Sequence, residues 1–407
     1  MRYIKLSAFV LFAAVLILPF THTSSVQSQS VTEAPTFDMD NRTDDLNNGF
    51  STTADFAAAR EEFEGVEGVA DGLGPCYNAQ SCRECHQNPE TGGATQISEF
   101  RAGHQDAFGN FVDAPGGSLI NDRAIAAAIQ ERVSSADPVR TFRMTRSTFG
   151  DGFVEAIANT TLQANVAAQP SGQRGTLINV DVFEAPGQTR IGRFGWKDQQ
   201  ASLLSFSADA YLNEMGITSN FAQTRNENTS NGNSVAAFDG VPDPEDADNV
   251  DVGLFTTFMR SLSAPGRGPI TTQVNQGAAL FDSLGCDICH TPTFVTAAPG
   301  TLINGGATTV AAALGNKRIH PYSDFALHNV GTGDGIVQNG GQGSANQLNT
   351  PALWGIRSRI RLMHDGESLT VNEAILRHDG QATGIRNTYN ALSTANKQAV
   401  IAFVLSL

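Results

Sequence analysis

The chain has little positive charge, few cysteines and only one long apolar run. It has 26 Lys and Arg against 41 Asp and Glu in 407 residues, so its formal net charge is −15. That balance argues against a protein that binds the phosphate backbone of nucleic acids. Beyond residue 20, no segment is apolar over a length that would cross a bilayer. The length is ample for two or three domains, each with a buried core.

The N-terminus has the layout of a secretory signal. Arg2 and Lys5 precede an apolar run over residues 6–20, and a stretch rich in Ser, Thr and Gln follows it. A spanning helix needs about 20 apolar residues, so this run is short for one. We therefore expect residues 1–30 to be a signal peptide and the mature protein to be periplasmic. An uncleaved N-terminal anchor is the alternative.

Four of the five cysteines fall in two copies of the pentad Cys-x-x-Cys-His. The copies are Cys82, Cys85 and His86, and Cys286, Cys289 and His290. Two thiols at this spacing can add across the vinyl groups of one haem, and the histidine is then held where it can bind the iron. A redox dithiol does not need that histidine, and a zinc site needs four ligands close together. The pentads therefore predict two covalently bound c-type haems with His86 and His290 as iron ligands, which agrees with export. The fifth cysteine, Cys76, is expected to be a buried apolar residue.

The hydrophobic patterns predict a mainly α protein with two cytochrome c-like haem domains, a small β-hairpin insertion and long loops. Helices are expected over residues 56–63, 122–133, 201–215, 252–262, 272–284, 371–377 and 394–405. The hairpin is expected over residues 177–194, and long loops over 226–249 and 332–346. A linker composition at residues 263–269 places the domain boundary there. We expect an enlarged N-terminal haem domain over residues 31–262 and a C-terminal cytochrome c-like domain over residues 263–407.

Several motifs around the pentads resemble those of bacterial di-haem oxidoreductases and peroxidases. These are relatives of the di-haem cytochrome c peroxidases and of the di-haem enzyme that matures tryptophan tryptophylquinone. The matching stretches are residues 74–78 (GPCYN), 260–266 (RSLSAPG), 321–329 (PYSDFALHN), 350–353 (TPAL) and 363–366 (MHDG). The likeness runs from about residue 55 to the C-terminus, and its C-terminal half is the more specific part.

The resemblance implies a distal ligand for the second haem. In cytochrome c peroxidases this ligand, usually methionine, follows the histidine of a His-Asp-Gly triplet by fourteen residues. The same step from His364 leads to His378, so the second haem is expected to have two histidine ligands, His290 and His378. Imidazole in place of a thioether lowers the reduction potential. His328 and His364 are expected to form hydrogen bonds near the haem edges. The alternative for His378 is a surface histidine at a helix end.

The resemblance also implies residues for the reactive side. A stretch that begins at Trp196 and ends at Glu214 is similar to the family stretch that runs from the tryptophan between the haems to the distal glutamate of the peroxidatic haem. Trp196 would then relay electrons, and Glu214 would act as general acid and base at the first haem. Phe206 occupies a position that is glutamine in cytochrome c peroxidases. Glu155 is the alternative to Glu214 as general acid and base. His104 is the histidine that could bind the first haem iron as a second ligand.

The expected activity is reduction of hydrogen peroxide with electrons from a periplasmic donor, a small redox protein such as a cytochrome c or a cupredoxin. An acidic surface favours encounter with a basic partner of this kind. Two alternatives remain: an electron-transfer cytochrome with both irons six-coordinate, and a di-haem oxidase of an organic or protein substrate. Such peroxidases often form homodimers and bind calcium between the domains. Arg361 stands where the family has a proline that contributes a calcium ligand, so calcium is not assumed.

Overall fold

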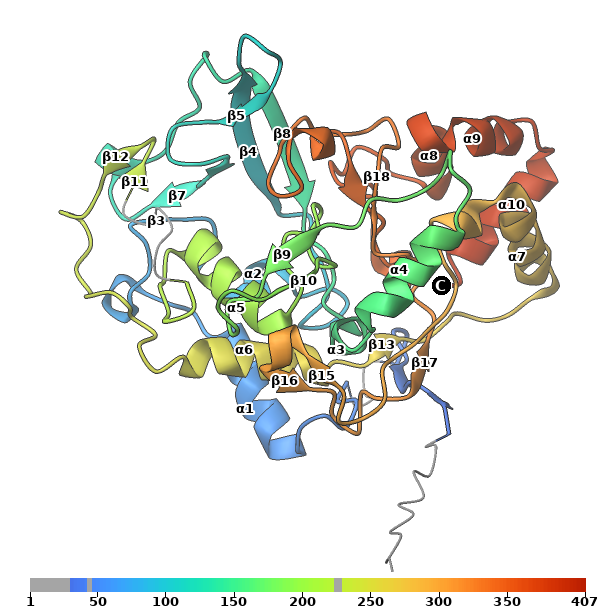
Figure 1. The fold of residues 1–407 in the computed structure, drawn as a ribbon, viewed down its shortest axis with the longest axis horizontal. Helices are drawn as coiled ribbons and strands as arrows, with labels where there is room; N and C mark the ends of the chain where they lie inside the picture. The colour runs from blue at the N-terminus through green and yellow to red at the C-terminus, as the bar shows by residue number, and fades with distance from the viewer. Residues whose placement is uncertain (1–29, 42–45, 223–228) are drawn as a thin grey trace, which may run out of the picture. The chain divides into compact units, whose positions relative to one another are not determined.

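The structure of this chain, a computed structural model, describes residues 30–41, 46–222 and 229–407 (Figure 1). Residues 31–407 form one compact unit. The signal peptide expected over residues 1–30 lies outside the described residues except for Ser30. Among the described residues, no helix has both the length and the apolar character needed to cross a membrane.

Helices account for 31% of the described residues, so a mainly α fold is not confirmed. The largest sheet has four antiparallel strands that the sequence patterns did not predict. They are β4 (Ser98–Gln105), β5 (Phe111–Asp113), β6 (Leu119–Ile120) and β8 (Val139–Met144). Strand β4 pairs with each of the other three. A Cβ at Gly103 would lie 2.4 Å from the Val112 carbonyl oxygen, so glycine permits the close approach of β5.

The helix expected over residues 122–133 was wrong. This segment holds strand β7 (Arg123–Ala124), which pairs with β3 (Cys76–Tyr77), and a single 3₁₀ turn (Ala127–Ile129). The Glu131 side chain accepts hydrogen bonds from the backbone N–H groups of Asn121 and Asn231. These hydrogen bonds tie Glu131 to residues outside the expected helix, and this tertiary context overrides the helix propensity of the alanines.

Helices that the sequence predicted surround the first pentad. Helix α1 (Thr53–Glu64) packs against α6 (Val250–Ser261), which confirms the helices expected at 56–63 and 252–262. The Phe63 and Phe258 ring centres are 4.7 Å apart. The other helices of this part are α2 (Cys82–Cys85), α3 (Asp151–Glu155), α4 (Asn159–Ala168), α5 (Leu203–Ala210) and the π-helix η3 (Tyr211–Met215). Helices α5 and η3 fill the range expected at 201–215.

The second pentad follows α7 (Thr272–Leu284) and lies in the 3₁₀ turn η4 (Cys286–Ile288). Helix α10 (Thr394–Val404) packs closely on α7, as Figure 1 also shows. A Cβ at Gly277 would lie 1.9 Å from the Ala399 carbonyl oxygen, so only glycine allows this approach. Helix α8 (Val371–Leu376) confirms the helix expected at 371–377, whereas α9 (Thr383–Asn390) was not predicted.

The remaining strands are short. The expected hairpin is confirmed as β9 (Asn179–Asp181) paired antiparallel with β10 (Thr189–Ile191). The others are β11 (Thr229–Ser230), β12 (Asn233–Ser234), β14 (Phe294–Val295), β15 (Leu302–Ile303), β16 (Thr308–Thr309), β18 (Leu327–His328) and β19 (Leu348–Asn349).

The N-terminal segment pairs with strands from the second half of the chain. Strand β1 (Thr32–Glu33) lies parallel to β17 (Lys317–Ile319), and β2 (Thr36–Phe37) lies parallel to β13 (Ala264–Pro265). The backbone N–H of Gly266, in the expected linker, donates to the carbonyl of Phe37 at 2.8 Å. The expected domain boundary therefore lies in a segment that is hydrogen-bonded to the N-terminal strands, and the boundary stays a prediction.

Candidate functional site

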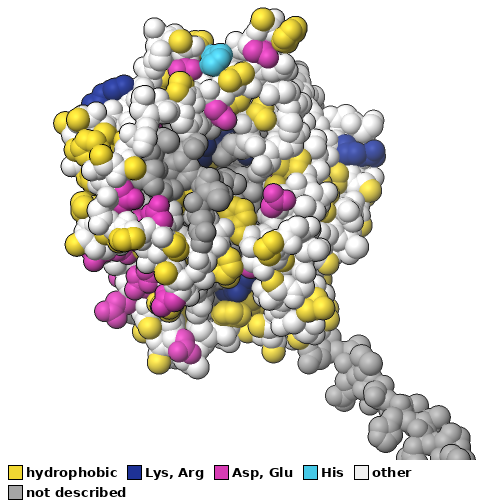
Figure 2. Space-filling view, turned by 60° about the vertical axis from the view of Figure 1, so that its left-hand side comes forward, with side chains coloured by type: hydrophobic (Ala, Val, Ile, Leu, Met, Phe, Trp, Pro, Cys, Tyr) yellow, Lys and Arg dark blue, Asp and Glu magenta, His cyan; other side chains and the backbone are white. Residues whose placement is uncertain are grey.

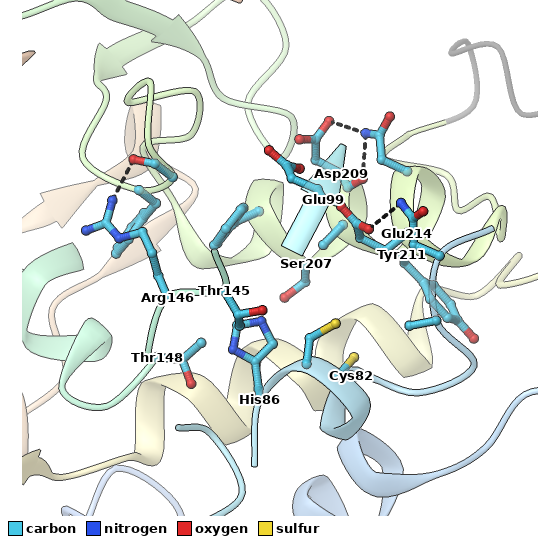
Figure 3. Close-up of a pocket in the computed structure, with 18 of the residues that line it drawn as sticks. Cys82, His86, Glu99, Thr145, Arg146, Thr148, Ser207, Asp209, Tyr211 and Glu214 are labelled. Carbon is cyan, nitrogen blue, oxygen red and sulfur yellow. Dashed lines mark hydrogen bonds between the residues drawn. The ribbon is translucent and has the colours of Figure 1, made fainter. Parts of the chain in front are cut away.

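A cavity of about 1380 Å³, including its opening to solvent, surrounds the first pentad (Figure 3). Cys82 and Cys85 stand at the two ends of α2 and line this first cavity as free thiols. Burial raises the pKa of both thiols, so they stay protonated at neutral pH. The opposite wall comes from β4, α5 and η3. The first cavity therefore lies between the pentad and the elements that bring in polar side chains.

His86 is a half-buried, neutral imidazole. Its Nδ1 lies 3.2 Å from the Gly93 carbonyl oxygen. Burial lowers the pKa of His86 to about 4, although the carbonyls of Gly93 and Arg146 oppose this. A hydrogen bond at Nδ1 fixes the tautomer in which Nε2 carries the lone pair, as a metal-binding histidine requires.

Glu214 faces the pentad from the opposite wall, where Figure 3 also places Glu99 and Asp209. It lies in η3, and π-helical turns are common at functional sites. The carbonyl of Glu214 accepts the backbone N–H of Asn78 at 2.7 Å, and its carboxylate accepts the Asn78 side-chain amide at 2.8 Å. Burial and the nearby Glu99 charge raise the pKa of Glu214 to about 7, although the bond from Asn78 opposes this. This carboxyl group can therefore gain or lose a proton near neutral pH.

A chain of buried charges lies behind Glu214. Glu99 accepts from Arg101 at 2.8 Å and lies 3.5 Å from Arg143. Arg143 in turn pairs with Asp334 at 2.7 Å, and Lys197 reaches the same carboxylate at 2.9 Å. The chain joins β4 and β8 to the loop at 332–346. Sequence reasoning missed these residues because it did not predict the sheet that holds the first three of them.

Trp196 lines both the first cavity and the cavity around the second pentad. Its side chain is buried, and its Nε1 donates to the Met144 carbonyl at 2.8 Å. The guanidinium of Arg146 lies 5.4 Å from the indole centre, and the ring centre of His364 lies 6.1 Å away. The indole is thus fixed in the wall that the two cavities share.

The second cavity, of about 1390 Å³ with its opening, surrounds Cys286, Cys289 and His290. Both cysteines are free thiols. The Nδ1 of His290 lies 3.0 Å from the Tyr322 carbonyl oxygen, which again leaves the lone pair on Nε2. Burial lowers the pKa of His290 to about 4. The two cavities therefore present the same donor set of two thiols and one neutral imidazole.

His378 lies across the second cavity from His290, with the two ring centres 6.5 Å apart. It directly follows the segment of α8, and its Nδ1 bonds to the Ala374 carbonyl at 2.7 Å. Burial lowers the pKa of His378. The alternative for His378 was a surface histidine at a helix end. A side chain that lines the second cavity does not agree with that alternative.

Two further histidines line the second cavity, His328 and His364. His328 bonds to Asp324 at 2.8 Å and lies 3.7 Å from the Cys289 sulfur. Burial opposes its protonation, but the bonds to Asp324 and Cys289 outweigh burial and raise the pKa of His328 to about 10. The Nδ1 of His364 is buried without a hydrogen-bond partner. The side chains of Cys289, Asp324 and His328 lie close enough to one another to bind one metal ion. Cys289, however, belongs to the second pentad.

Two arginines line the cavities. Arg146 lines the first cavity and Arg359 the second, and the carboxylates of Asp151 and Asp198 lie near enough to Arg146 to attract its charge. Their hydrogen bonds go to the carbonyls of Gly195, at 2.6 Å, and Thr145, at 2.9 Å. Burial lowers the pKa of both guanidinium groups. A guanidinium group in the wall of each cavity is compatible with a bound group that carries carboxylates, such as haem.

Two residues considered from the sequence lie outside both cavities. His104, on β4, is more than a third exposed, and its Nδ1 lies 3.0 Å from Asp137, so it does not close the first cavity. Glu155 accepts two bonds from Arg260, at 2.6 and 2.9 Å, and one from the Leu203 N–H at 2.9 Å. Although burial opposes it, Arg260 lowers the pKa of Glu155 to about 2. This carboxylate is a structural ion-pair partner and not the acid of the cavity.

The C-terminal 289 residues, 119–407, match the family described as "Di-haem oxidoreductase, putative peroxidase". The chain belongs to this family. It is therefore an oxidoreductase of a family that carries two haems. The match includes the second pentad, and the first pentad precedes it. No curated protein matches the chain.

The solved structures that resemble this di-haem oxidoreductase share little sequence with it. Hydrazine synthase of Kuenenia stuttgartiensis is 12% identical with a TM-score of 0.43, over 98% of this chain and 100% of that one. A MauG-like protein associated with microbial copper homeostasis is 13% identical with a TM-score of 0.41, over 97% and 95%. The diheme peroxidase BthA of Burkholderia thailandensis E264 is 14% identical with a TM-score of 0.41, over 93% and 92%. These TM-scores are low, so we draw no inference from them.

Proposed function

We propose that this di-haem oxidoreductase is an exported c-type cytochrome peroxidase that reduces hydrogen peroxide with electrons from a small redox protein. The observation that carries the proposal is the difference between the two cavities. In the first, a carboxyl group with a pKa of about 7, Glu214, faces the pentad. In the second, a histidine, His378, faces His290. One cavity is suited to proton transfer and the other to a closed, six-coordinate iron.

The pentads would hold the two haems through thioether bonds. In each cavity the two cysteine sulfurs would carry the porphyrin, and His86 or His290 would bind the iron through Nε2. Arg146 and Arg359 would pair with carboxylates of the porphyrins. When bound, the haems supply one-electron redox chemistry and a site for the peroxide.

Glu214 would act as the general base and then the general acid. Reduction of one hydrogen peroxide breaks the O–O bond, consumes two electrons and two protons, and yields two waters. The carboxylate of Glu214 takes a proton from one peroxide oxygen and returns it to the oxygen that leaves. The Asn78 amide, 2.8 Å from this carboxylate, holds it in place. A pKa of about 7 suits both directions of transfer near neutral pH.

His378 would be the second ligand of the second iron. The ring centres of His290 and His378 lie 6.5 Å apart, so the two imidazoles could hold one metal ion between them. Two imidazoles also give a lower reduction potential than imidazole and thioether. The second site would then store and transfer electrons without binding peroxide.

Trp196 would carry electrons between the two sites. It lines both cavities, and its hydrogen bond to Met144 holds the indole in one orientation. The electrons would come from a basic donor such as a small cytochrome c. The net charge of −15 favours such an encounter, and acidic side chains gather on the lower left of the face in Figure 2.

Steady-state turnover of the purified holoprotein tests this function. With hydrogen peroxide and a reduced small cytochrome c, we expect two donors to be oxidised for each peroxide consumed. The ferric spectrum should contain a high-spin fraction from the first haem. Absence of turnover together with a fully low-spin spectrum would instead identify an electron-transfer cytochrome. Oxidation of an organic or protein substrate in place of the donor would identify the third function considered from the sequence.

A further inference from the structure

A buried carboxylate, that of Asp334, links the two segments between which the indole of Trp196 is held. One oxygen of Asp334 accepts the Nε–H of Arg143 at 2.8 Å, and the other lies 2.9 Å from the Nζ of Lys197. All three side chains are at most 1% exposed. Burial opposes the ionisation of Asp334, but Arg143 and Lys197 outweigh burial and lower its pKa. The carboxylate is therefore ionised and pairs with both cations.

The two partners of Asp334 are the sequence neighbours of the two residues that the indole hydrogen bond joins. The Nε1 of Trp196 donates to the Met144 carbonyl at 2.8 Å. Met144 follows Arg143 on β8, and Lys197 follows Trp196. The carboxylate thus connects residue 143 with residue 197, while the indole connects residue 144 with residue 196. Two links between the same two segments fix the orientation of the indole more firmly than the single indole hydrogen bond could.

The segment of Trp196 is also bound to the chain that follows Asp334. The Nζ of Lys197 donates to three backbone carbonyls, those of Ser344, Ala345 and Gln347, at 3.2, 2.8 and 2.8 Å. The backbone N–H of Asn349 donates to the Trp196 carbonyl at 2.8 Å. The stretch that begins at Asp334 therefore holds the Trp196 segment through one carboxylate and four backbone groups.

This group of residues reaches from one cavity to the other. Arg143 lines the first cavity, and Thr332, two residues before Asp334, lines the second. Trp196 lines both. Asp334 itself lines neither cavity, so it acts on the site only through the residues that it binds.

We propose that Asp334 is a positioning residue that fixes the indole of Trp196 in the wall shared by the two cavities and thereby sets the rate of electron exchange between them. The second half of this proposal rests on the proposed function, in which Trp196 carries the electrons. A buried ion pair often adds little net stability, because desolvation of the charges offsets their attraction. A side chain that transfers electrons, in contrast, needs one fixed geometry, which this ion pair provides.

Two variants of the full-length holoprotein remove the carboxylate. Both are made in a Trp354→Phe parent, in which Trp196 is the only tryptophan. Asp334→Asn removes the negative charge at nearly the same size. Asp334→Asn combined with Lys197→Met also removes one buried cation, so it leaves fewer charges without a partner and keeps the test valid if the single variant does not fold.

Glu155→Gln in the same parent is the matched control. The side chain of Glu155 is 2% exposed, pairs with Arg260 at 2.6 Å and lines neither cavity. The control therefore loses a buried ion pair of the same kind at a place that does not touch Trp196. Absorption spectra and the number of porphyrins bound per chain show that each variant folds.

Two measurements separate position from function. Ultraviolet resonance Raman spectra contain an indole band whose frequency depends on the hydrogen bond at Nε1, so they report the placement of Trp196 directly. Electron exchange between the haems, followed after rapid reduction of one of them, reports the path. A loss of stability alone would lower the resistance to urea without moving the indole band.

Both Asp334 variants should shift the indole band towards that of a weaker hydrogen bond and slow electron exchange by about tenfold. Glu155→Gln should lower the resistance to urea and keep the indole band and exchange rate of the parent. An unchanged band in the Asp334 variants would overturn the positioning role, whatever the exchange rate. A shifted band with the exchange rate of the parent would overturn the second half of the proposal. If the wild type shows no turnover with peroxide, the peroxidase function fails, and the indole band still decides whether Asp334 positions Trp196.

Discussion

The two cavities of this di-haem oxidoreductase have similar volumes and the same pentad. They differ in the groups that face the histidine of each pentad. The first cavity has one histidine, His86, and a buried carboxyl group opposite it. The second has four histidines, of which His378 faces His290. The two sites share the pentad that we propose to hold a haem, and they differ in the opposite wall, on which the proposed proton transfer and electron storage depend.

Removal of the thiols of one pentad should have the largest effect. Cys82→Ala with Cys85→Ala, or Cys286→Ala with Cys289→Ala, should each yield a protein with one covalently bound porphyrin in place of two. Thioether formation needs those sulfurs, and the mass of the intact protein measures it. Cys76→Ala is the control and should keep both porphyrins, because this buried thiol donates to the Ile129 carbonyl and lines neither haem cavity. Wild-type protein with fewer than two porphyrins would contradict the whole assignment.

Glu214→Gln should abolish the proton transfer that sets the first cavity apart. We expect kcat/KM for peroxide to fall by about 10²- to 10⁴-fold, the usual contribution of general acid–base catalysis. The base must be ionised, so wild-type activity should rise as the pH increases through about 7, and the variant should lose this dependence. Because folding raises this pKa, ionisation of Glu214 also lowers the free energy of unfolding as the pH rises towards 7.

The matched control for that substitution is Glu62→Gln. Burial also raises the pKa of Glu62, but it lies on α1 and lines neither cavity. Its pH profile and kcat/KM should match the wild type. A Glu214→Gln variant with wild-type kcat/KM would remove Glu214 from the reaction.

His378→Ala should make the second cavity resemble the first. Loss of the facing imidazole should convert the second haem from low spin to high spin, while the spectrum of the first haem stays the same. His378→Met should restore a low-spin haem with a higher reduction potential, which spectropotentiometry measures. His104→Ala, outside both cavities, should change neither haem. An unchanged spectrum in His378→Ala would exclude His378 as a ligand.

Trp196→Phe should weaken the connection between the cavities and leave both haems intact. The substitution removes the indole and leaves the Met144 carbonyl without its donor, which costs about 1–3 kcal/mol of stability. Electron exchange between the haems, followed after rapid reduction of one of them, should slow down while both absorption spectra stay the same. Exchange at the wild-type rate would show that electrons take another path.

Some elements could be predicted because their signal is local. Helix α7 begins at Thr272, after the N-cap Thr271, whose side chain accepts the Val274 N–H, and it ends before Gly285 in the left-handed conformation. Caps and apolar spacing of this kind lie within one stretch of sequence. The residues 122–133 show the limit, because Glu131 binds backbone N–H groups ten and one hundred residues away. No local pattern contains that information.

The residues of the candidate site show the same difference between local signals and tertiary contacts. The family spacing from His364 led to His378, which the structure places across the second cavity from His290, and its role as a ligand stays a prediction. The sequence did not indicate Glu99 and Arg101. They lie on β4, a strand in which apolar and polar residues alternate only weakly and whose pairing partners are distant in sequence. Charged residues on such a strand can form ion pairs around a cavity only after folding brings the strand and its partners together.

The sequence by itself determined the two pentads and their histidines, on which the proposed haem attachment depends, because thiol addition and iron binding need residues adjacent in the chain. Only the tertiary structure decided which side chains face those pentads. It placed Glu214 beside Glu99, so that burial and like charge shift its pKa to about 7, and it placed Trp196 in the wall of both cavities. Such effects depend on distances between elements far apart in sequence, which folding alone sets.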